Sequence, residues 1–232
     1  MSVENGGSGL ASSFTDLMTS LAVIFILLFV STLNKQGAER ENRKRETQNI
    51  VVRDVGDRLD RFKVLGVRVE PDAKDPLIVR IITPEKLLRF AVNESTIPEG
   101  GSAFLEKFAP ALVEAVSVQA ALGHVNSLVV EGHTDMTGTD AHNLRLSQER
   151  ATEVSLQILD ILGRVRPELK IQFMNMQSTA GRGYAEPLAE PGPENEAEVN
   201  DRNRRVVFKV RLSGPEDATL LSQVGEVRNA HP

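Results

Sequence analysis

The chain has 232 residues, which suits one ordinary globular domain with additional elements or two small domains. Its formal net charge of −5 is mild and gives no reason to expect nucleic acid as a direct partner. The absence of cysteine excludes disulfides, thiolate metal sites and cysteine nucleophiles.

The first predicted element is an apolar segment near the N-terminus. Residues 1–12 are rich in Gly and Ser and are expected to be flexible. Residues 13–33 supply about 20 mostly apolar residues, the length that a helix needs to cross roughly 30 Å of hydrocarbon. No Lys or Arg precedes them, whereas a secretory signal peptide carries a basic region there. The sequence therefore predicts a retained single transmembrane helix over residues 13–33.

Asp16 is an unusual residue for the start of such a span, because a carboxylate in hydrocarbon is costly. On a helix it shares a face with Thr19 and Ser20, three and four residues further on. The local sequence leaves three interpretations open. Asp16 lies in the headgroup region, favoured by the helix dipole, or it is a buried hydrogen-bonding residue, or it has a function as an ionisable group.

Residues 34–66 are dense in charges of both signs and predict a helical linker. In the second half of this segment, Val51, Val55, Leu59 and Phe62 recur at helical spacing. This stripe is narrow enough to pair with another helix. A solvated helical spacer explains the pattern equally well.

From residue 67 to about residue 212, strand and helix patterns predict a compact α+β domain. The expected strands are two within residues 67–82, then 127–135, 169–176 and 204–212, and the expected helices are 101–118 and 142–162. Strands separated by helices, with a hairpin at the start, indicate a mixed β-sheet with helices on one face. Residues 184–200 predict a Pro/Gly/Glu-rich loop, and residues 213–232 are expected to be a loose tail.

Asp135 and Arg150 are candidate binding residues because one ends a predicted strand and the other lies early on the following helix. A free carboxylate beside a free guanidinium matches an amino acid zwitterion: the aspartate binds the ammonium, and the arginine binds the carboxylate through two hydrogen bonds. The alternative, favoured by spacing alone, is a direct salt bridge between these two residues.

Metal and catalytic functions are not expected from the sequence. His124, His133 and His142 are not spaced so that ligands stack on one helix face, as in a His-x-x-x-His pair. His133 is instead expected to hydrogen-bond within its own motif. Neither a nucleophile–base pair nor a nucleotide-binding loop stands out. A binding protein without metal or cofactor is predicted, rather than an enzyme.

Four segments, in this order, resemble the OmpA-like peptidoglycan-binding domain: "FAVNEST" at 90–96, "VEGHTDMTGTDAHNLRLSQERATEV" at 130–154, "GRGYAEPLA" at 181–189 and "NDRNRRVVFKV" at 200–210. The resemblance covers residues 67–212. It implies binding of the diaminopimelate of peptidoglycan stem peptides. The positions that match the family's ligand contacts are Asn93, Asp135, Thr137, Asn143, Arg150 and Arg204.

The sequence Asp16-Leu17-Met18-Thr19 resembles the motif of MotB-like B subunits of ion-driven rotary stators. Together with the spacer and the OmpA-like domain, this resemblance implies that Asp16 and Thr19 take part in ion translocation. It also implies a homodimer surrounded by membrane lipid and by multi-span A subunits of the MotA or ZorA type, in an A5B2 assembly. Either H⁺ or Na⁺ fits the residues around Asp16.

The short, non-basic N-terminus and the loop at residues 135–151 differ from flagellar MotB proteins and favour the stators of Zorya anti-phage defence. A flagellar stator and a passive peptidoglycan anchor remain alternatives. The resemblance implies a bacterial inner-membrane protein with a cytoplasmic N-terminus and a periplasmic C-terminal domain. One feature disagrees with that orientation: the basic residues that follow the span favour the cytoplasmic side. They are Lys35, Arg40, Arg43, Lys44 and Arg45.

Overall fold

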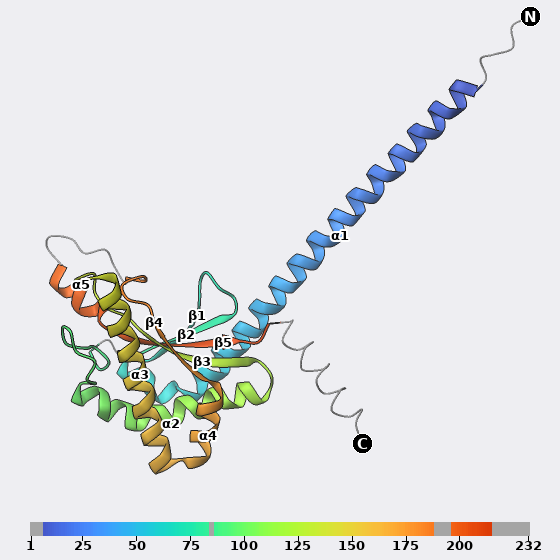
Figure 1. Ribbon diagram of the computed structural model, residues 1–232. Helices are drawn as coiled ribbons and strands as arrows, with labels where there is room; N and C mark the ends of the chain where they lie inside the picture. The colour runs from blue at the N-terminus through green and yellow to red at the C-terminus, as the bar shows by residue number, and fades with distance from the viewer. Residues whose placement is uncertain (1–6, 84–85, 188–195, 215–232) are drawn as a thin grey trace, which may run out of the picture. The chain divides into compact units, whose positions relative to one another are not determined.

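The computed structural model describes residues 7–83, 86–187 and 196–214 (Figure 1). The chain divides into two compact units, residues 1–43 and residues 44–232. Helix α1 (Gly7–Arg58) contributes residues to both units. Each unit is described by itself below.

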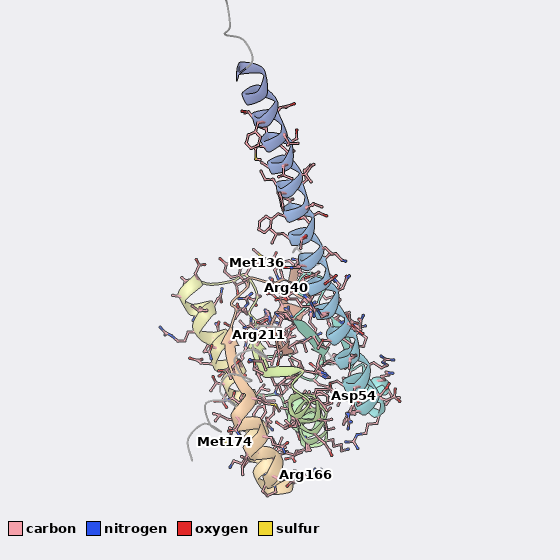
Figure 2. The ribbon with its side chains drawn as sticks, turned by 90° about the vertical axis from the view of Figure 1, so that its right-hand side faces the viewer. Arg40, Asp54, Met136, Arg166, Met174 and Arg211 are labelled. Carbon is pink, nitrogen blue, oxygen red and sulfur yellow. The ribbon has the colours of Figure 1, made fainter. Side chains whose placement is uncertain are left out.

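The described part of the first unit is helical from Gly7 onward. Residues 7–12 of the segment that was expected to be flexible belong to helix α1, and residues 1–6 lie outside the described residues. All side chains from Phe14 to Leu33 are exposed, among them Leu17 at 63% and Phe29 at 65% (Figure 2). α1 is long and apolar enough to cross a membrane. A helix that exposes apolar side chains on all sides is typical of a membrane span.

The second unit contains a five-stranded mixed sheet with the strand order β1-β2-β5-β3-β4. β3 and β4 are parallel, and the other neighbouring strands are antiparallel. After the end of α1 the elements are η1 (Asp60–Leu65), β1 (Arg68–Pro71), β2 (Ile78–Ile82), α2 (Glu99–Ala121), β3 (Val125–Gly132), α3 (Asp140–Val165), α4 (Pro167–Met176), β4 (Gln177–Gly181), α5 (Glu196–Asn203) and β5 (Val206–Leu212).

One face of this sheet is buried by helices, as the sequence predicted (Figure 1). Alternate side chains on the central strands point into the core because strand residues alternate between the two faces. Leu128 and Val130 of β3 and Phe208 and Val210 of β5 are all fully buried. α2, α3 and α4 pack against this side of the sheet. The α+β class and the mixed sheet are therefore confirmed.

The strand predicted at residues 169–176 is wrong, because these residues form α4. Pro167 occupies the start of this helix, where its missing N–H costs no hydrogen bond. Leu169, Phe173 and Met176 recur at helical spacing and are the buried residues of α4. The adjacent strand β4 consists of "QSTAG", whose small residues give little strand signal in the sequence.

The apolar stripe predicted in the linker belongs to the core of the second unit. Val51 and Val55 are 0% exposed, and Phe62 contacts Phe108 edge-on with ring centroids 5.4 Å apart. On the same stretch of α1, Gln48 Nε2 donates a hydrogen bond to the Ile78 carbonyl at 2.7 Å. The interpretation as a solvated spacer is therefore wrong, and the stripe packs within its own chain, where Phe62 contacts helix α2.

Asp54 of α1 (Figure 2) ties this segment to α2, since it accepts a hydrogen bond from Gln119 Nε2 at 2.7 Å. Residues 44–66 are thus part of the folded unit rather than a linker leading to it. The folded unit starts at residue 44, whereas the sequence predicted a start at residue 67, so the last part of α1 and η1 belong to it.

A fragment of residues 44–214 is expected to unfold cooperatively on heating, whereas a fragment of residues 67–214 is expected to lack a stable fold. Burying one Val, Leu or Phe side chain stabilises a protein by about 1.5–3 kcal/mol. The four residues of the stripe therefore contribute about 6–12 kcal/mol, as much as the whole stability of an ordinary domain, about 5–15 kcal/mol. Circular dichroism melting of the two fragments measures this. Equal melting temperatures would contradict the boundary at residue 44.

Candidate functional site

The structure brings all six predicted ligand-contact residues of the second unit into one small pocket. They come from four separate segments: the loop before α2, the loop after β3, helix α3 and the residues before β5. The residues that line the pocket are Val92, Asn93, Thr134, Asp135, Thr137, Asn143, Leu146, Arg150 and Arg204. Val92, Thr134 and Leu146 were missed, because apolar or small residues beside a motif carry no signal of their own.

Asp135 supplies the carboxylate of the pocket and is held by two neighbours. It accepts hydrogen bonds from the backbone N–H of Thr137 at 3.0 Å and from the Thr137 hydroxyl, and it pairs with Arg204 Nη1 at 2.8 Å. Burial alone would raise the pKa of Asp135, but the bonds from Thr137 and Arg204 outweigh it and lower this pKa. The carboxylate is therefore charged at neutral pH. The direct salt bridge with Arg150 that the sequence allowed does not form.

Arg150 supplies a buried cation that forms no ion pair with a carboxylate of the described residues, although the charge of Asp135 lies near enough to favour its protonated form. Its side chain is 0% exposed. It donates from Nε to the Glu94 carbonyl at 2.8 Å, from Nη1 to that of His133 at 2.9 Å and from Nη2 to that of Ala91 at 2.9 Å. Burial, followed by repulsion from Arg204, lowers the pKa of Arg150 to about 10, so the group stays protonated at neutral pH.

A guanidinium carries five N–H groups, so these three bonds leave two for a ligand. Arg150 therefore has two functions: it fixes the loop that carries Asn93, and it lines the pocket. The sequence predicted only the second function.

Arg204 closes another side of the pocket. Besides its pair with Asp135, it donates from Nη2 to Asp201 at 2.6 Å and from Nε to the Phe90 carbonyl at 3.1 Å. Asp201 also pairs with Arg89. Arg204 makes three hydrogen bonds, as Arg150 does, but two of its acceptors are carboxylates that offset its charge.

The two asparagines of the pocket are positioned by their backbones. Asn93 has a positive φ of 57°, and its Oδ1 lies 3.1 Å from Nε2 of His142. Asn143 lies in the first turn of α3, which begins at Asp140 with Thr139 as the N-cap. Within the described part of the chain, the buried Asn143 Nδ2 has no hydrogen-bond acceptor. Leaving a buried donor unpaired is costly, so this amide is suited to a ligand's oxygen.

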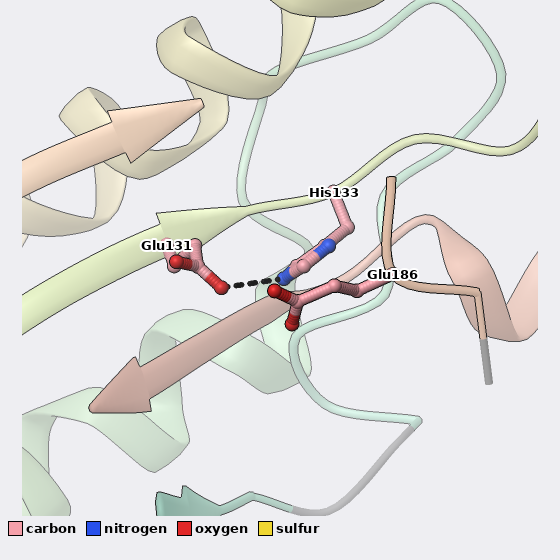
Figure 3. A group of neighbouring side chains, drawn as sticks. All are labelled: Glu131, His133 and Glu186. Atoms are coloured by element: carbon pink, nitrogen blue, oxygen red, sulfur yellow. Dashed lines mark ion pairs between the residues drawn. The ribbon is translucent and has the colours of Figure 1, made fainter. Parts of the chain in front are cut away.

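A second cluster of polar side chains lies just before Asp135, where Glu131, His133 and Glu186 meet (Figure 3). Nε2 of His133 is 3.2 Å from Glu131 Oε1, but among the described residues neither ring nitrogen of His133 meets the geometry of a hydrogen bond, so the bond predicted within the motif stays a prediction. Burial lowers the pKa of His133, so the imidazole is neutral at neutral pH.

Two cations neutralise this cluster. Lys209 Nζ pairs with Glu131 and lies 3.1 Å from Glu186, and Arg182 lies 2.8 Å from Glu186. Burial would raise the pKa of Glu186, but Arg182 and Lys209 lower it to about 2. The ammonium of Lys209 stands where a metal ion would have to bind, so the residues do not favour a metal centre.

In the first unit, Asp16 and Thr19 lie one turn apart on α1, and both are exposed. The Thr19 hydroxyl donates to the Thr15 carbonyl at 2.8 Å, which leaves its oxygen free to accept. The helix thus presents a carboxylate and a hydroxyl oxygen on one face, as predicted from their spacing.

Comparison with known proteins agrees with this architecture. Residues 89–202 match the OmpA family. Over 209 residues the chain is 22% identical to the Zorya protein ZorB of Escherichia coli, covering 88% of this chain and 81% of ZorB. Outer membrane protein A of Bordetella avium is 30% identical over 122 residues, 52% of each protein.

Among solved structures, that of a putative MotB-like protein from Desulfovibrio vulgaris covers 75% of this chain and 99% of its own, with 20% identity and a TM-score of 0.49. Residues 89–202 are thus similar to the OmpA family, and the chain as a whole is similar to ZorB along most of its length.

Proposed function

We propose that this protein is the wall-anchored B subunit of an ion-driven stator of the Zorya type. Its C-terminal domain binds peptidoglycan in the periplasm, and its single N-terminal helix lies in the bacterial inner membrane. The similarity to ZorB over 88% of the chain and the OmpA-family match support this proposal. The candidate membrane span over the apolar part of α1 supports the same arrangement.

The buried charge of Arg150 is the observation that carries the wall-binding part of the proposal. An uncompensated buried cation is unfavourable, and an incoming carboxylate would neutralise it. Asn143 Nδ2 offers a further donor beside it. The Asp135 carboxylate is available to an ammonium. The zwitterionic end of diaminopimelate carries an ammonium group and a carboxylate group. A single residue of a stem peptide therefore supplies a partner for Asp135 and a partner for Arg150 and Asn143.

In the membrane, Asp16 is the proposed ion-carrying residue and Thr19 its neighbour. Protonation or Na⁺ binding neutralises the carboxylate, and release restores the charge, which changes how surrounding helices pack against it. Because the described residues contain one candidate span, the ion path needs further helices. We propose that multi-span A subunits of the ZorA or MotA type supply them around a homodimer of this chain, as A5B2. The stripe from Val51 to Phe62 is buried within its own chain, so the dimer contact rests on other residues.

The orientation is tested with reporter fusions in cells. Alkaline phosphatase, which is active only outside the cytoplasm, is expected to be active when fused after Pro232 and inactive when fused before Met1. The basic residues after the span make this a demanding test, because the positive-inside rule favours the opposite result. Activity at the N-terminus alone would exclude wall anchoring by the C-terminal domain.

A further inference from the structure

Four side chains of alternating charge form a row that starts in the pocket. Asp135 lies 2.8 Å from Nη1 of Arg204. The other terminal nitrogen of this guanidinium, Nη2, lies 2.6 Å from Asp201 Oδ1. Oδ2 of Asp201 in turn pairs with Nη1 of Arg89. Arg204 is therefore shared between two carboxylates, and of these two only Asp135 lines the pocket.

The backbone holds this row in place independently of its charges. The Phe90 N–H donates to the Arg204 carbonyl at 3.0 Å, and Arg204 Nε donates to the Phe90 carbonyl at 3.1 Å. Arg89 forms an antiparallel bridge with Arg205, and Asp201 precedes Arg204 by three residues, on helix α5. The row is therefore expected to keep its geometry when one of its outer charges is removed.

Arg204 weakens the proposed ammonium site, and Asp201 limits this effect. A cation beside Asp135 neutralises part of the charge that a ligand's ammonium would meet, and it repels the ammonium itself. Asp201 offsets the charge of Arg204 from outside the pocket. Arg89 acts in the opposite direction, because it neutralises Asp201. The side chains of Asp201 and Arg89 are 36% and 25% exposed, so solvent reduces these effects without abolishing them.

We propose that Asp201 and Arg89 set the affinity of the pocket for an ammonium group, although neither of them lines it. Asp201 holds part of the charge of Arg204 and so leaves Asp135 more open to the ammonium. Arg89 competes with Arg204 for Asp201 and so reduces this effect. Both are positioning residues, since they act on the ligand only through Arg204. The inference rests on the proposed binding of a diaminopimelate zwitterion in this pocket.

Two charge-removing variants are expected to change the affinity in opposite directions. Asp201→Asn keeps the size of the side chain and an oxygen for Arg204 but removes the charge, so the whole charge of Arg204 acts on Asp135. Its affinity for a muropeptide that contains diaminopimelate is expected to fall about fivefold, an effect of the size that a partly exposed ion pair can have. Arg89→Gln leaves Asp201 to Arg204 alone, and its affinity is expected to rise about threefold. If Asp201 and Arg89 only kept Arg204 in place, both variants would bind more weakly.

Isothermal titration calorimetry of the full chain in detergent micelles with this muropeptide measures both affinities. Asp201→Glu restores the charge and is expected to bind like the wild type. The matched controls are Asp160→Asn and Arg164→Gln, which remove the same charges from an exposed ion pair on α3 and are expected to leave binding unchanged. Because the outer charges of the row are partly exposed, the difference between Asp201→Asn and Arg89→Gln is expected to shrink at high salt. Thermal melting confirms that each variant is folded.

The possible results separate this inference from the proposed function. A wild-type protein that binds the muropeptide, with both variants equal to it or both weaker, would overturn the inference alone. Loss of binding by Asp201→Asn that Asp201→Glu does not restore would assign Asp201 a structural role in place of the electrostatic one. A folded wild-type protein that does not bind the muropeptide would overturn the inference and the proposed function together.

Discussion

Replacing Asp135 by alanine is expected to weaken binding of the protein to purified peptidoglycan by about 30-fold or more. The change removes the proposed partner of the ligand's ammonium. It also releases Arg204 from its 2.8 Å ion pair, so that two cations face an incoming ammonium. Removing one member of a buried, hydrogen-bonded charge pair at an interface costs about 2–5 kcal/mol, and each 1.4 kcal/mol is a tenfold change in affinity. Sedimentation with increasing amounts of peptidoglycan measures the effect.

Two further variants separate lost binding from lost folding. Asp160→Ala removes an exposed carboxylate of α3, whose side chain is 70% exposed, and is expected to leave wall binding unchanged. Asp135→Asn keeps the shape of the side chain and removes only its charge, so it is expected to bind as weakly as the alanine variant. If a folded Asp135→Asn protein bound like the wild type, an ammonium could not be the group that Asp135 recognises.

Arg150→Ala tests ligand binding by this pocket less cleanly than Asp135→Ala does, although the sequence predicts that both residues contact the ligand. Its guanidinium holds three backbone carbonyls, and its side chain is fully buried over the ring of Phe90. Losing it leaves the buried carbonyl of His133 without this donor, which costs about 1–3 kcal/mol, and it also removes the bonds that hold the loop at Ala91 and Glu94. Loss of wall binding by this variant would therefore report on folding as much as on the ligand.

Asp16→Asn is expected to abolish ion flux through the assembled complex and to leave membrane insertion and wall binding intact. Asparagine has nearly the same size and can hydrogen-bond, but it neither gains nor loses a proton and carries no charge for Na⁺. The measurement is dye-reported ion flux in proteoliposomes that contain this chain and its A subunit, with H⁺ and Na⁺ gradients tested separately.

The matched control for this variant lies on the same helix. The Thr32 hydroxyl donates to the Leu28 carbonyl, as that of Thr19 does to Thr15, yet Thr32 is far from Asp16 along the span. Thr32→Ala is expected to conduct normally, and Thr19→Ala to conduct less. Normal flux through the Asp16→Asn protein would favour the passive anchor over the motor subunit.

The pocket was predictable from the sequence to the level of its residues, because each of its contributing segments carries its own motif. The pairing inside the pocket was not predictable. Asp135 and Arg150 are close in sequence, but the choice of Arg204 as the partner of Asp135 depends on β5 lying beside β3, a long-range contact. The contacts of Arg150 likewise involve carbonyls more than fifty residues away, at Ala91 and Glu94.

Two of the differences between the predicted and the observed fold have a common physical cause. In α4, Ile171 and Phe173 alternate as in a strand, while Leu169, Phe173 and Met176 follow the helical period, and a short apolar segment satisfies both patterns. In α1, the stripe from Val51 to Phe62 shows that one helix face is buried, but no local pattern says against what. In both cases tertiary packing decides between equal local alternatives.

The central claim, that the pocket around Asp135 and Arg150 binds the zwitterionic end of a stem peptide, is tested most directly by an NMR titration. The titrated protein is the fragment of residues 44–214, and the ligand is a muropeptide that contains diaminopimelate. Saturable shifts are predicted at the amides of Asn93, Thr137 and Asn143, with none for a muropeptide that contains lysine in place of diaminopimelate. The absence of shifts, or shifts confined to the open face of the sheet, would contradict the claim.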